Sequence, residues 1–325
     1  MELSVIICTH NPRKDYLERT LNALRAQTLP KEQWELLLID NASKEPLAKS
    51  WDLSWHSQAR HIREEQLGLT PARLRGIKES KGELLLFVDD DNMLQPDYLA
   101  VLLNLAEEHS KLGCFGAGIL EPEFEQEPSP ELRPYTFNLA LRSIEKPEWS
   151  NSMNEARKPL GAGLAVRRMV AEKSAAVVQS CPIRIQLDRC GSTLNSGGDD
   201  EFSWAACEMG LGKGLFPALK IKHLIGQKRV EKQYLLSIVK GNGFSLAMLA
   251  HLHGQTIYLP PTSSTFADIL CSLFRAKLSM TLYHANAWWL GLHKPPIEKD
   301  FEDAWRSGVD EARKKLAELK PAKNN

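Results

Sequence analysis

The sequence feature that most constrains this chain is a buried-strand pattern that runs directly into three acidic residues. Residues 84–88 are all apolar and include an aromatic and a β-branched side chain, which is typical of a strand covered on both faces. Asp89, Asp90 and Asp91 follow at once. Crowded carboxylates repel one another unless cations, hydrogen bonds or solvent relieve them. Oxygen ligands at this spacing suit Mg²⁺ or Mn²⁺, although a solvated acidic turn is an equal interpretation of the triplet alone.

Length and composition limit the class of protein. A chain of 325 residues suggests about two domains, or one large domain with an appendage. The 41 basic and 41 acidic residues cancel, so no overall field favours nucleic acid as a partner. The six cysteines show no C-x-x-C spacing, which favours reduced thiols over a zinc site. The N-terminal residues lack the pattern of a signal peptide, so we expect a cytoplasmic protein.

Strand patterns alternate with helical patterns over the first two thirds of the chain. This alternation predicts an α/β fold, in which a mostly parallel sheet is flanked by helices. Asn11 before Pro12, and Thr70 before Pro71, are typical of helix starts. The expected strands are residues 3–9, 35–39, 60–63, 84–88, 114–120, 160–167 and 219–224, and the expected helices are 12–27, 70–80, one from 96, and one from about 200 to 209.

Polar clusters follow three of the expected strands. They are Thr9-His10-Asn11, Asp40-Asn41 and the acidic triplet. Ligands of parallel α/β sheets bind at the carboxyl ends of the strands, so the three clusters should converge on one binding site. The alternative is that polar residues simply begin loops at these positions.

Three further segments contain candidate functional residues. Residues 121–160 are rich in proline and glutamate and predict a long loop. Gly161 and Gly163 would let backbone approach a ligand or another strand closely. Asp200 lies at an expected helix start, where it is either favoured by the helix dipole or acts as a general base. His223 lies on an expected strand and is either structural or a metal ligand.

From about residue 226 the pattern is helical only, so we divide the chain into domains at residues 1–225 and 226–325. The expected helices are 234–250, 267–292 and 300–319. The middle helix is apolar but carries cations, and Trp288 and Trp289 are near its end. It could therefore lie on a membrane surface, or it could pack against the main domain or a dimer partner.

The chain resembles bacterial family-two glycosyltransferases. The resemblance covers about residues 1–225 and depends on an ordered set of motifs: SVIICTHNPR, LLIDNAS, GLTPARLRGIKESKGELLLFVDDDN, GAGLAVRR and GGDDEFSWAACEMG before IKH. It implies a GT-A-type, Rossmann-like, mostly parallel sheet flanked by helices, with a C-terminal helical extension. Asp199 in place of the more usual Glu, and Leu74 in place of Asn, depart from the family pattern.

The resemblance also implies roles for individual residues. Asp200 falls at the position of the catalytic base. Asp89, Asp91 and His223 fall at the positions that hold Mn²⁺ or Mg²⁺. The residues expected to bind the nucleotide-sugar donor are Thr9, His10, Asn11, Arg13, Asp40, Asn41, Arg73, Asp89 and Asp90, and those expected on the acceptor side are Gly161, Ala162, Gly163 and Asp199.

Arg73 is suggestive on physical grounds as well. It lies in the first turn of its expected helix, where the dipole disfavours a cation. A nearby anion, either an aspartate or a diphosphate, would explain the arginine, and a surface arginine without a role is the alternative.

These expectations combine into one function. An inverting, metal-dependent glycosyltransferase would move a sugar from a nucleotide-diphosphate sugar, most often a UDP-sugar among relatives, to a saccharide or lipid-linked acceptor. Surface polysaccharide or glycolipid synthesis would suit a cytoplasmic enzyme with peripheral contact to the inner face of the membrane through its C-terminal helices. We expect residues 121–160, residues 161–167 and the helical tail to select the acceptor.

Two other functions compete with this one. A nucleotidyltransferase would need a glycine-rich, basic phosphate loop after the first strand, where this chain reads CTHNPR. A non-catalytic nucleotide-binding or scaffolding protein on a transferase fold would not need Asp91, Asp200 and His223.

Overall fold

The computed structural model describes residues 2–153, 158–255 and 296–319. The strands are β1 (Leu3–Thr9), β2 (Trp34–Asn41), β3 (Ala59–Glu64), β4 (Leu84–Val88), β5 (Asn92–Leu94), β6 (Leu112–Phe124), β7 (Arg142–Ser143), β8 (Glu148–Ser150), β9 (Leu164–Arg167) and β10 (Gly212–Ile225). The α-helices are α1 (Lys14–Arg25), α2 (Leu69–Glu79), α3 (Tyr98–Glu108), α4 (Arg168–Gln179), α5 (Pro182–Ile185), α6 (Gly198–Glu208), α7 (Lys232–Leu252) and α10 (Pro296–Leu319). Short 3₁₀ helices are η1 (Lys31–Gln33), η2 (Leu47–Lys49), η3 (Arg133–Leu139) and η4 (Gln227–Val230).

One sheet organises the molecule, with the strand order β3-β2-β1-β4-β9-β6-β10-β5. Neighbouring strands from β3 to β4 are parallel, and β6 is parallel to β10. Because β9 is antiparallel to both β4 and β6, the strands β6 and β10 run in the same direction as β1. The prediction of a mostly parallel sheet is therefore confirmed for the main strands, while β5, β7, β8 and β9 run against them.

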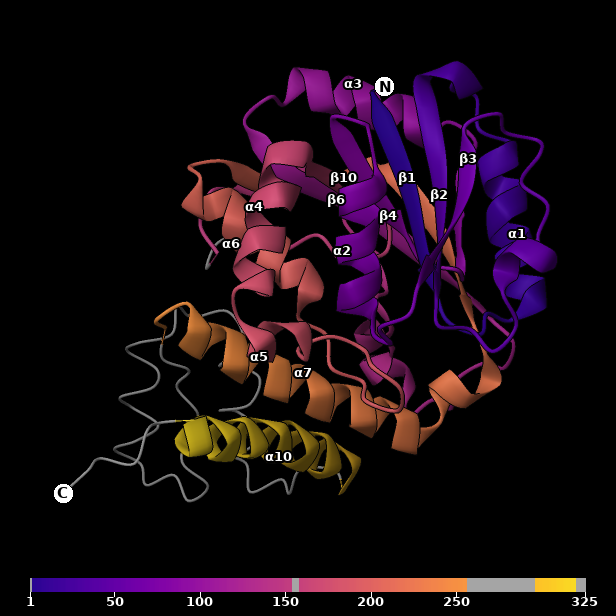
Figure 1. Ribbon diagram of the computed structural model, residues 1–325. Helices are drawn as coiled ribbons and strands as arrows, with labels where there is room; N and C mark the ends of the chain where they lie inside the picture. The colour runs from indigo at the N-terminus through magenta and orange to yellow at the C-terminus, as the bar shows by residue number, and fades with distance from the viewer. Residues whose placement is uncertain (1, 154–157, 256–295, 320–325) are drawn as a thin grey trace.

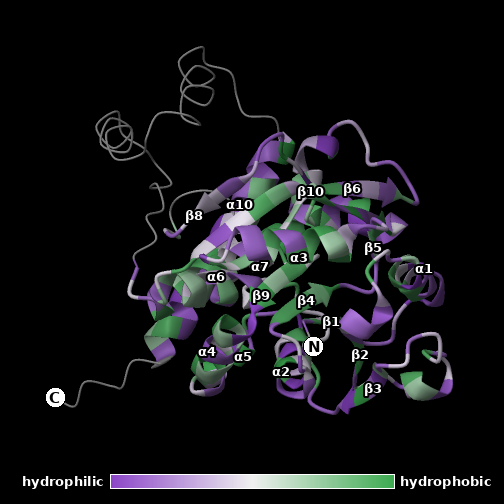
Figure 2. Ribbon diagram, turned by 90° about the horizontal axis from the view of Figure 1, so that it is seen from above, coloured by the Kyte–Doolittle hydropathy of each residue, from purple (hydrophilic) through white to green (hydrophobic). Residues whose placement is uncertain are grey.

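Helices cover both faces of this sheet (Figure 1). Along β1, Val5 and Ile7 join the cluster beneath α1 and α3, and Ile6 joins the cluster beneath α2, α4 and α6. This alternation follows from the two-residue period of a strand. Figure 2 shows hydrophobic residues along the inner strands β1 and β4. A sheet buried on both faces explains why these strands read as continuous apolar runs.

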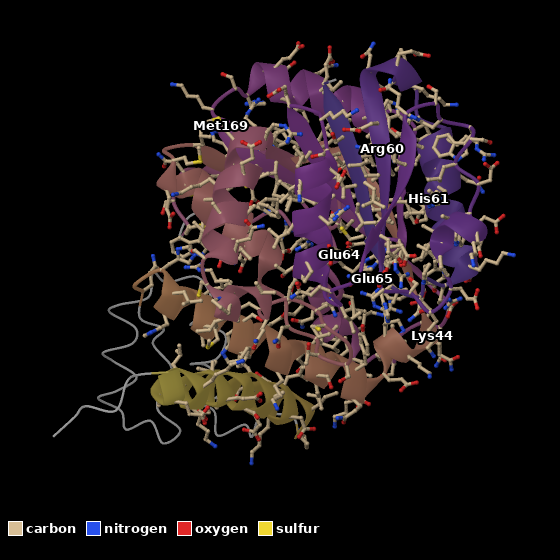
Figure 3. All side chains as sticks on the ribbon, in the orientation of Figure 1. Lys44, Arg60, His61, Glu64, Glu65 and Met169 are labelled. Atoms are coloured by element: carbon tan, nitrogen blue, oxygen red, sulfur yellow. The ribbon has the colours of Figure 1, made fainter. Side chains whose placement is uncertain are left out.

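The outer edge of the sheet is formed by β3, whose side chains are mostly polar. Arg60, His61 and Glu64 lie along it (Figure 3). Arg60 donates to Glu35 on the neighbouring strand at 3.1 Å. Charged side chains on an edge strand discourage pairing with another chain, so they disfavour the addition of a further strand at β3.

The C-terminal helices α7 and α10 pack against each other below the carboxyl ends of the strands (Figure 1). By length and composition α7 could cross a membrane, since it has 21 residues and contains an 18-residue stretch with a mean hydropathy of 1.3. However, 61% of that 18-residue stretch is buried inside the protein, as is common for a core helix. The helix predicted at 267–292, with Trp288 and Trp289, lies outside the described residues, so membrane contact stays a prediction.

Two helix starts differ from the expectation. Asn11 has a φ of 47°, and α1 begins only at Lys14. Asn11 instead ties the loop after β1 to the loop after β2, because its backbone N–H donates to Ser43 and its side-chain oxygen accepts from Lys44, both at 2.9 Å. In α2 the residue before the helix is Gly68, with a φ of 137°, so Thr70 lies inside the first turn.

Two segments also differ. Residues 121–160 are not a continuous loop, because β6 extends to Phe124 and the segment also contains η3, β7 and β8. The strand expected from residue 160 begins only at Leu164. Gly163 has a φ of 72°, a left-handed conformation that interrupts an extended chain.

Candidate active site

A cavity of about 990 Å³ opens at the carboxyl ends of the main strands. This is the edge of a parallel sheet where ligands bind in α/β proteins. The three polar clusters that follow β1, β2 and β4 all contribute to it. The predicted site residues that line the cavity are Thr9, His10, Asn41, Arg73, Asp89, Asp90, Asp91, Gly161, Ala162, Asp199, Asp200 and His223.

The acidic triplet forms the turn between β4 and β5. Burial, followed by repulsion from Asp91, raises the pKa of Asp89 and raises that of Asp90 to about 7. Thr9, at the end of β1, donates a short hydrogen bond to the Asp90 carboxylate. The triplet is therefore partly buried in the cavity wall, and side-chain partners hold Asp90 and Asp91, so it is not a fully solvated turn.

Asp91 differs from its two neighbours because His223 and Arg229 both contact its carboxylate. The pairing of β10 with β5 places His223 opposite Asn92, and His223 Nε2 lies 3.3 Å from Asp91 Oδ2. Arg229, in η4, donates to the same oxygen at 2.6 Å. Burial would raise the pKa of Asp91, but His223 and Arg229 outweigh it and hold the pKa well below its usual range. Asp91 is therefore an anion at neutral pH.

The fit of these residues to a divalent metal can be tested on the donor atoms. Among the residues that the structure describes, no group of three or more His, Cys, Asp or Glu side chains is arranged to hold a metal ion. Asp91 and His223 nevertheless direct an oxygen and a nitrogen towards one point, where the Arg229 guanidinium now lies. Mg²⁺ and Mn²⁺ bound with nucleotides commonly take one or two protein ligands and complete their shell with phosphate oxygens and water. These two residues fit that pattern.

Arg73 forms a buried ion pair on the wall of the cavity. Its Nη1 donates to Asp188 Oδ2 at 2.8 Å, and both side chains are almost fully buried. Burial would lower the pKa of Arg73, but Asp188, Asp199 and Asp89 outweigh it and raise the pKa. Of the two anions considered from the sequence, the structure identifies an aspartate.

Two glycines make room for this ion pair. A Cβ at Gly161 would lie 2.4 Å from Arg73 Nη2, and a Cβ at Gly198 would lie 2.1 Å from Asp188 Oδ2 and 2.7 Å from Arg73 Nη1. Larger residues at either position would collide with the paired side chains. The glycines in the motifs GAG and GGDD therefore permit the ion pair.

Asp199 and Asp200 lie in the first turn of α6, but their side chains have different partners. Asp199 Oδ2 accepts the backbone N–H of Gly161 at 2.9 Å, which fixes the loop before β9. Asp200 faces the cavity and pairs with Lys158 at 2.6 Å. Burial raises the pKa of Asp200, Lys158 opposes that rise, and Asp199 adds to it. A carboxylate whose pKa is raised towards neutrality is suited to accept a proton.

On the expected nucleotide side, His10 and Asn41 lie in the cavity. His10 Nδ1 lies 2.7 Å from the Asn41 backbone oxygen. Asn41 holds the next loop in place, because its side chain donates to Gln66 O at 2.7 Å and accepts from Gly68 N at 2.8 Å. The loops after β1 and β2 are thus joined into one wall.

Four predicted residues do not reach the cavity lining. Asn11 joins the two loops, as described above. Asp40 is saturated by its own loop, since it accepts from Ser43 N, Leu47 N and Arg63. Arg13 is half-exposed and pairs with Asp15 and Glu125, each at 2.6 Å. A Cβ at Gly163 would collide with Ile221 and Tyr98, so this glycine permits core packing rather than ligand approach.

The sequence interpretation missed several polar residues of the cavity. Among them are Lys158, Asp188, Arg189 and Arg229. No motif marks Asp188, Arg189 or Arg229, and the partners of Arg73 and Asp91 are 115 and 138 positions away in the chain. The available signal was charge balance: a buried arginine and a buried aspartate each require an opposite charge.

Comparison with known proteins agrees with this architecture. The model of "Glycosyl transferase family 2" matches residues 4–169. The chain is similar to glycosyltransferase AglE of Haloferax volcanii, with 35% identity over 92 residues, which are 27% of this chain and 30% of that protein. It is also similar to the glucosyl-dolichyl phosphate glucuronosyltransferase of the same organism, with 24% identity over 173 residues, 52% of this chain and 54% of that one. The matches thus span about a third to a half of these relatives.

A solved structure supports the same fold. The mannosyltransferase PcManGT from Pyrobaculum calidifontis, in complex with GDP-Man and Mn²⁺, superposes with a TM-score of 0.57 over 96% of this chain and 87% of that one, at 15% sequence identity. The GT-A-type fold predicted from the sequence is therefore confirmed. Because the family model covers just over half of the 325 residues, the chain belongs to glycosyl transferase family 2.

Proposed function

We propose that this chain is an inverting, divalent-metal-dependent glycosyltransferase that moves a sugar from a nucleotide-diphosphate sugar to an acceptor hydroxyl. One observation carries the proposal: a single cavity holds an ionised acid paired with a histidine, Asp91 and His223, and a separate acid of raised pKa, Asp200. The first pair suits a cation and a diphosphate, and the second acid suits a proton transfer.

The donor side of the reaction requires positive charge around a diphosphate. Arg73, Arg189 and Arg229 line the cavity together with His223. Asp91 and His223 would hold the divalent metal, with Asp89 beside them, and the ion would neutralise charge on the leaving diphosphate. Arginines orient phosphate oxygens through paired N–H groups, so Arg189 and Arg229 would fix the donor, while Arg73 is neutralised by Asp188.

The transfer step requires a base for the acceptor hydroxyl. Asp200 would take the proton of that hydroxyl as its oxygen attacks the anomeric carbon from the face opposite the diphosphate. A single displacement of this kind inverts the anomeric configuration. Lys158 opposes the effect of burial on the pKa of Asp200, so it would favour the ionised form that can accept a proton.

The acceptor side is supported by the apolar part of the cavity lining. Phe137 in η3, Tyr234 and Leu246 in α7, and Trp305 in α10 all contribute to it. Phe137 is 64% exposed although it is fully apolar. Aromatic faces next to open space suit a sugar ring or the start of a lipid chain. We propose a saccharide or lipid-linked saccharide as the acceptor, and we note that one H. volcanii relative is named for a dolichyl phosphate substrate.

Titration of UDP, GDP and CDP, each with Mn²⁺ and with a chelator, tests the donor site. We expect one nucleotide to bind by calorimetry, more tightly with metal than without. The Asp91→Ala protein should lose the metal-dependent part of that affinity. If no nucleotide binds under either condition, the proposed activity is refuted and a scaffolding role takes its place.

The cellular location is a separate proposal, namely the cytoplasm with peripheral contact to the inner face of the membrane. It is supported by the sequence of residues 267–292, in which Trp288 and Trp289 follow an apolar stretch that carries cations. Flotation of the full chain with anionic liposomes at low salt tests it. A chain that stays entirely at the bottom of the gradient would contradict membrane contact without bearing on the donor site.

A further inference from the structure

Arg229 occupies a position that no sequence pattern marks. It lies in η4, four residues after the end of β10, and its Nη1 is 2.6 Å from Asp91 Oδ2 and 3.1 Å from His223 Nε2. A guanidinium only donates hydrogen bonds, so His223 Nε2 must present its lone pair to Arg229. The carboxylate oxygen and the imidazole lone pair thus converge on one positively charged nitrogen.

This is the arrangement that a divalent ion requires. A metal bound by Asp91 and His223 uses the same oxygen and the same lone pair that Arg229 now engages. Two cations cannot share these donor atoms, because their charges would repel at short range in a partly buried place. The guanidinium must therefore leave before the metal can bind.

The contacts of Arg229 favour such an exchange. Its side chain is 22% exposed and lies at the margin of the cavity, so it has room to move. Its Nε is buried and makes no hydrogen bond among the described residues. Arg229 is thus held by its Nη1 contacts, whereas the buried Arg73 is enclosed by the packed glycines Gly161 and Gly198.

We propose that Arg229 is an internal counter-cation that fills the metal position of the nucleotide-free protein and exchanges with the divalent ion when the nucleotide diphosphate arrives. This inference rests on the proposed function and deepens it. The released guanidinium is drawn to the diphosphate, whose oxygens accept paired N–H donors. Metal alone must compete with Arg229 for Asp91, while metal with nucleotide does not. Arg229 therefore makes metal binding depend on the donor.

The test measures Mn²⁺ binding to the full chain by electron paramagnetic resonance, which counts the free ion, with and without UDP, GDP or CDP. The variant is Arg229→Met. The matched control is Lys222→Met, which removes the same charge one residue before His223, at an exposed lysine 3.7 Å from Glu123. We expect Arg229→Met to bind Mn²⁺ about tenfold more tightly without nucleotide. The gain in Mn²⁺ affinity caused by nucleotide should shrink in this variant, because the two effects are linked reciprocally.

The outcomes distinguish a failure of the Arg229 exchange from a failure of the proposed metal-dependent transferase function. If the unmodified chain binds Mn²⁺ with nucleotide but Arg229→Met matches Lys222→Met in nucleotide-free affinity, the exchange is refuted and the proposed function stands. If no protein binds Mn²⁺ with any nucleotide, the metal-dependent function fails and the exchange fails with it. Arg229→Gln serves as a second variant if thermal melting shows that Arg229→Met does not fold, and it should shift the affinity in the same direction.

Discussion

Asp91 and Asp200 face the same cavity, but their surroundings drive their protonation in opposite directions. Both are largely enclosed, with 15% and 17% of their side chains exposed, and burial by itself raises the pKa of a carboxyl. Asp91 contacts the Arg229 guanidinium and the His223 imidazole, which together outweigh burial, and its pKa falls well below the usual range. Asp200 has only Lys158 against burial and the charge of Asp199, and its pKa rises.

The difference shows how one residue type can serve two chemical roles. An acid held as an anion attracts cations and keeps its charge over the working range of pH. An acid whose pKa is raised accepts a proton more readily when a hydroxyl gives one up. Arg73 interacts electrostatically with Asp89, two residues before the first acid, and with Asp199, the neighbour of the second.

The largest expected effect is on turnover and concerns Asp200, the acid whose pKa is raised. Asp200→Asn removes the base but keeps the shape of the side chain, so turnover should fall by about a thousandfold. Nucleotide binding measured by calorimetry should stay unchanged, because the donor groups are elsewhere in the cavity. The exposed Asp97→Asn serves as the control and should keep full turnover. If the Asp200→Asn protein still transferred sugar at the normal rate, Asp200 would not be the base, and the proposed difference in role between Asp91 and Asp200 would be wrong.

The next largest effect concerns Arg73, which should contribute mainly to the free energy of unfolding. Arg73→Met leaves Asp188 buried without its cation, which should lower the free energy of unfolding by about 3 kcal/mol. Arg75→Met, on the same helix, breaks a partly exposed pair with Glu79 and should cost about 0.5 kcal/mol or less. Urea denaturation followed by circular dichroism measures both. Equal losses in the two variants would mean that the buried pair is not what holds this wall together.

A smaller effect should appear in the pH dependence of turnover. Lys158 lowers the pKa of Asp200, so Lys158→Met should raise that pKa further. The base works when deprotonated, so activity is lost as pH falls through this pKa. The acid limb of the kcat profile should therefore move to higher pH. Lys146→Met, at an exposed lysine of the same segment, should leave the limb in place, and a shift in the opposite direction would contradict the assignment of Asp200.

The smallest effect is expected outside the cavity. Arg13→Met should leave the nucleotide Kd within about twofold, since Arg13 is half-exposed and pairs with Asp15 and Glu125 rather than facing the cavity. Arg189→Met, at a residue that lines the cavity, is the comparison and should weaken binding more. Calorimetry with the best nucleotide decides between them. Strong weakening by Arg13→Met alone would restore the original expectation that Arg13 binds the donor.

Much of the donor wall could be predicted from sequence because it follows from strand direction. Thr9, Asn41 and Asp91 come directly after apolar runs, and parallel strands bring such ends together. Asp40 shows the limit of this reasoning. Side chains alternate along a strand, so Asp40 points away from the side that Asn41 faces, and its carboxylate accepts hydrogen bonds from Ser43 N and Leu47 N in the loop that follows. Arg229 and Asp188 could not be predicted, since their partners are far away in the chain and no local pattern marks either residue.

The close fit of Gly161 and Gly198 around Arg73 and Asp188 has a consequence for how this sequence can vary. The four positions depend on one another for two reasons. A side chain at either glycine would displace the ion pair, and loss of either charged residue would leave the other charge buried without a partner. Single substitutions should therefore be rejected at all four, while joint replacement of the pair by smaller neutral residues would open both glycine positions to alanine. Among distant relatives the four should change as a set, and a designer who wishes to reshape this side of the cavity has to redesign them together.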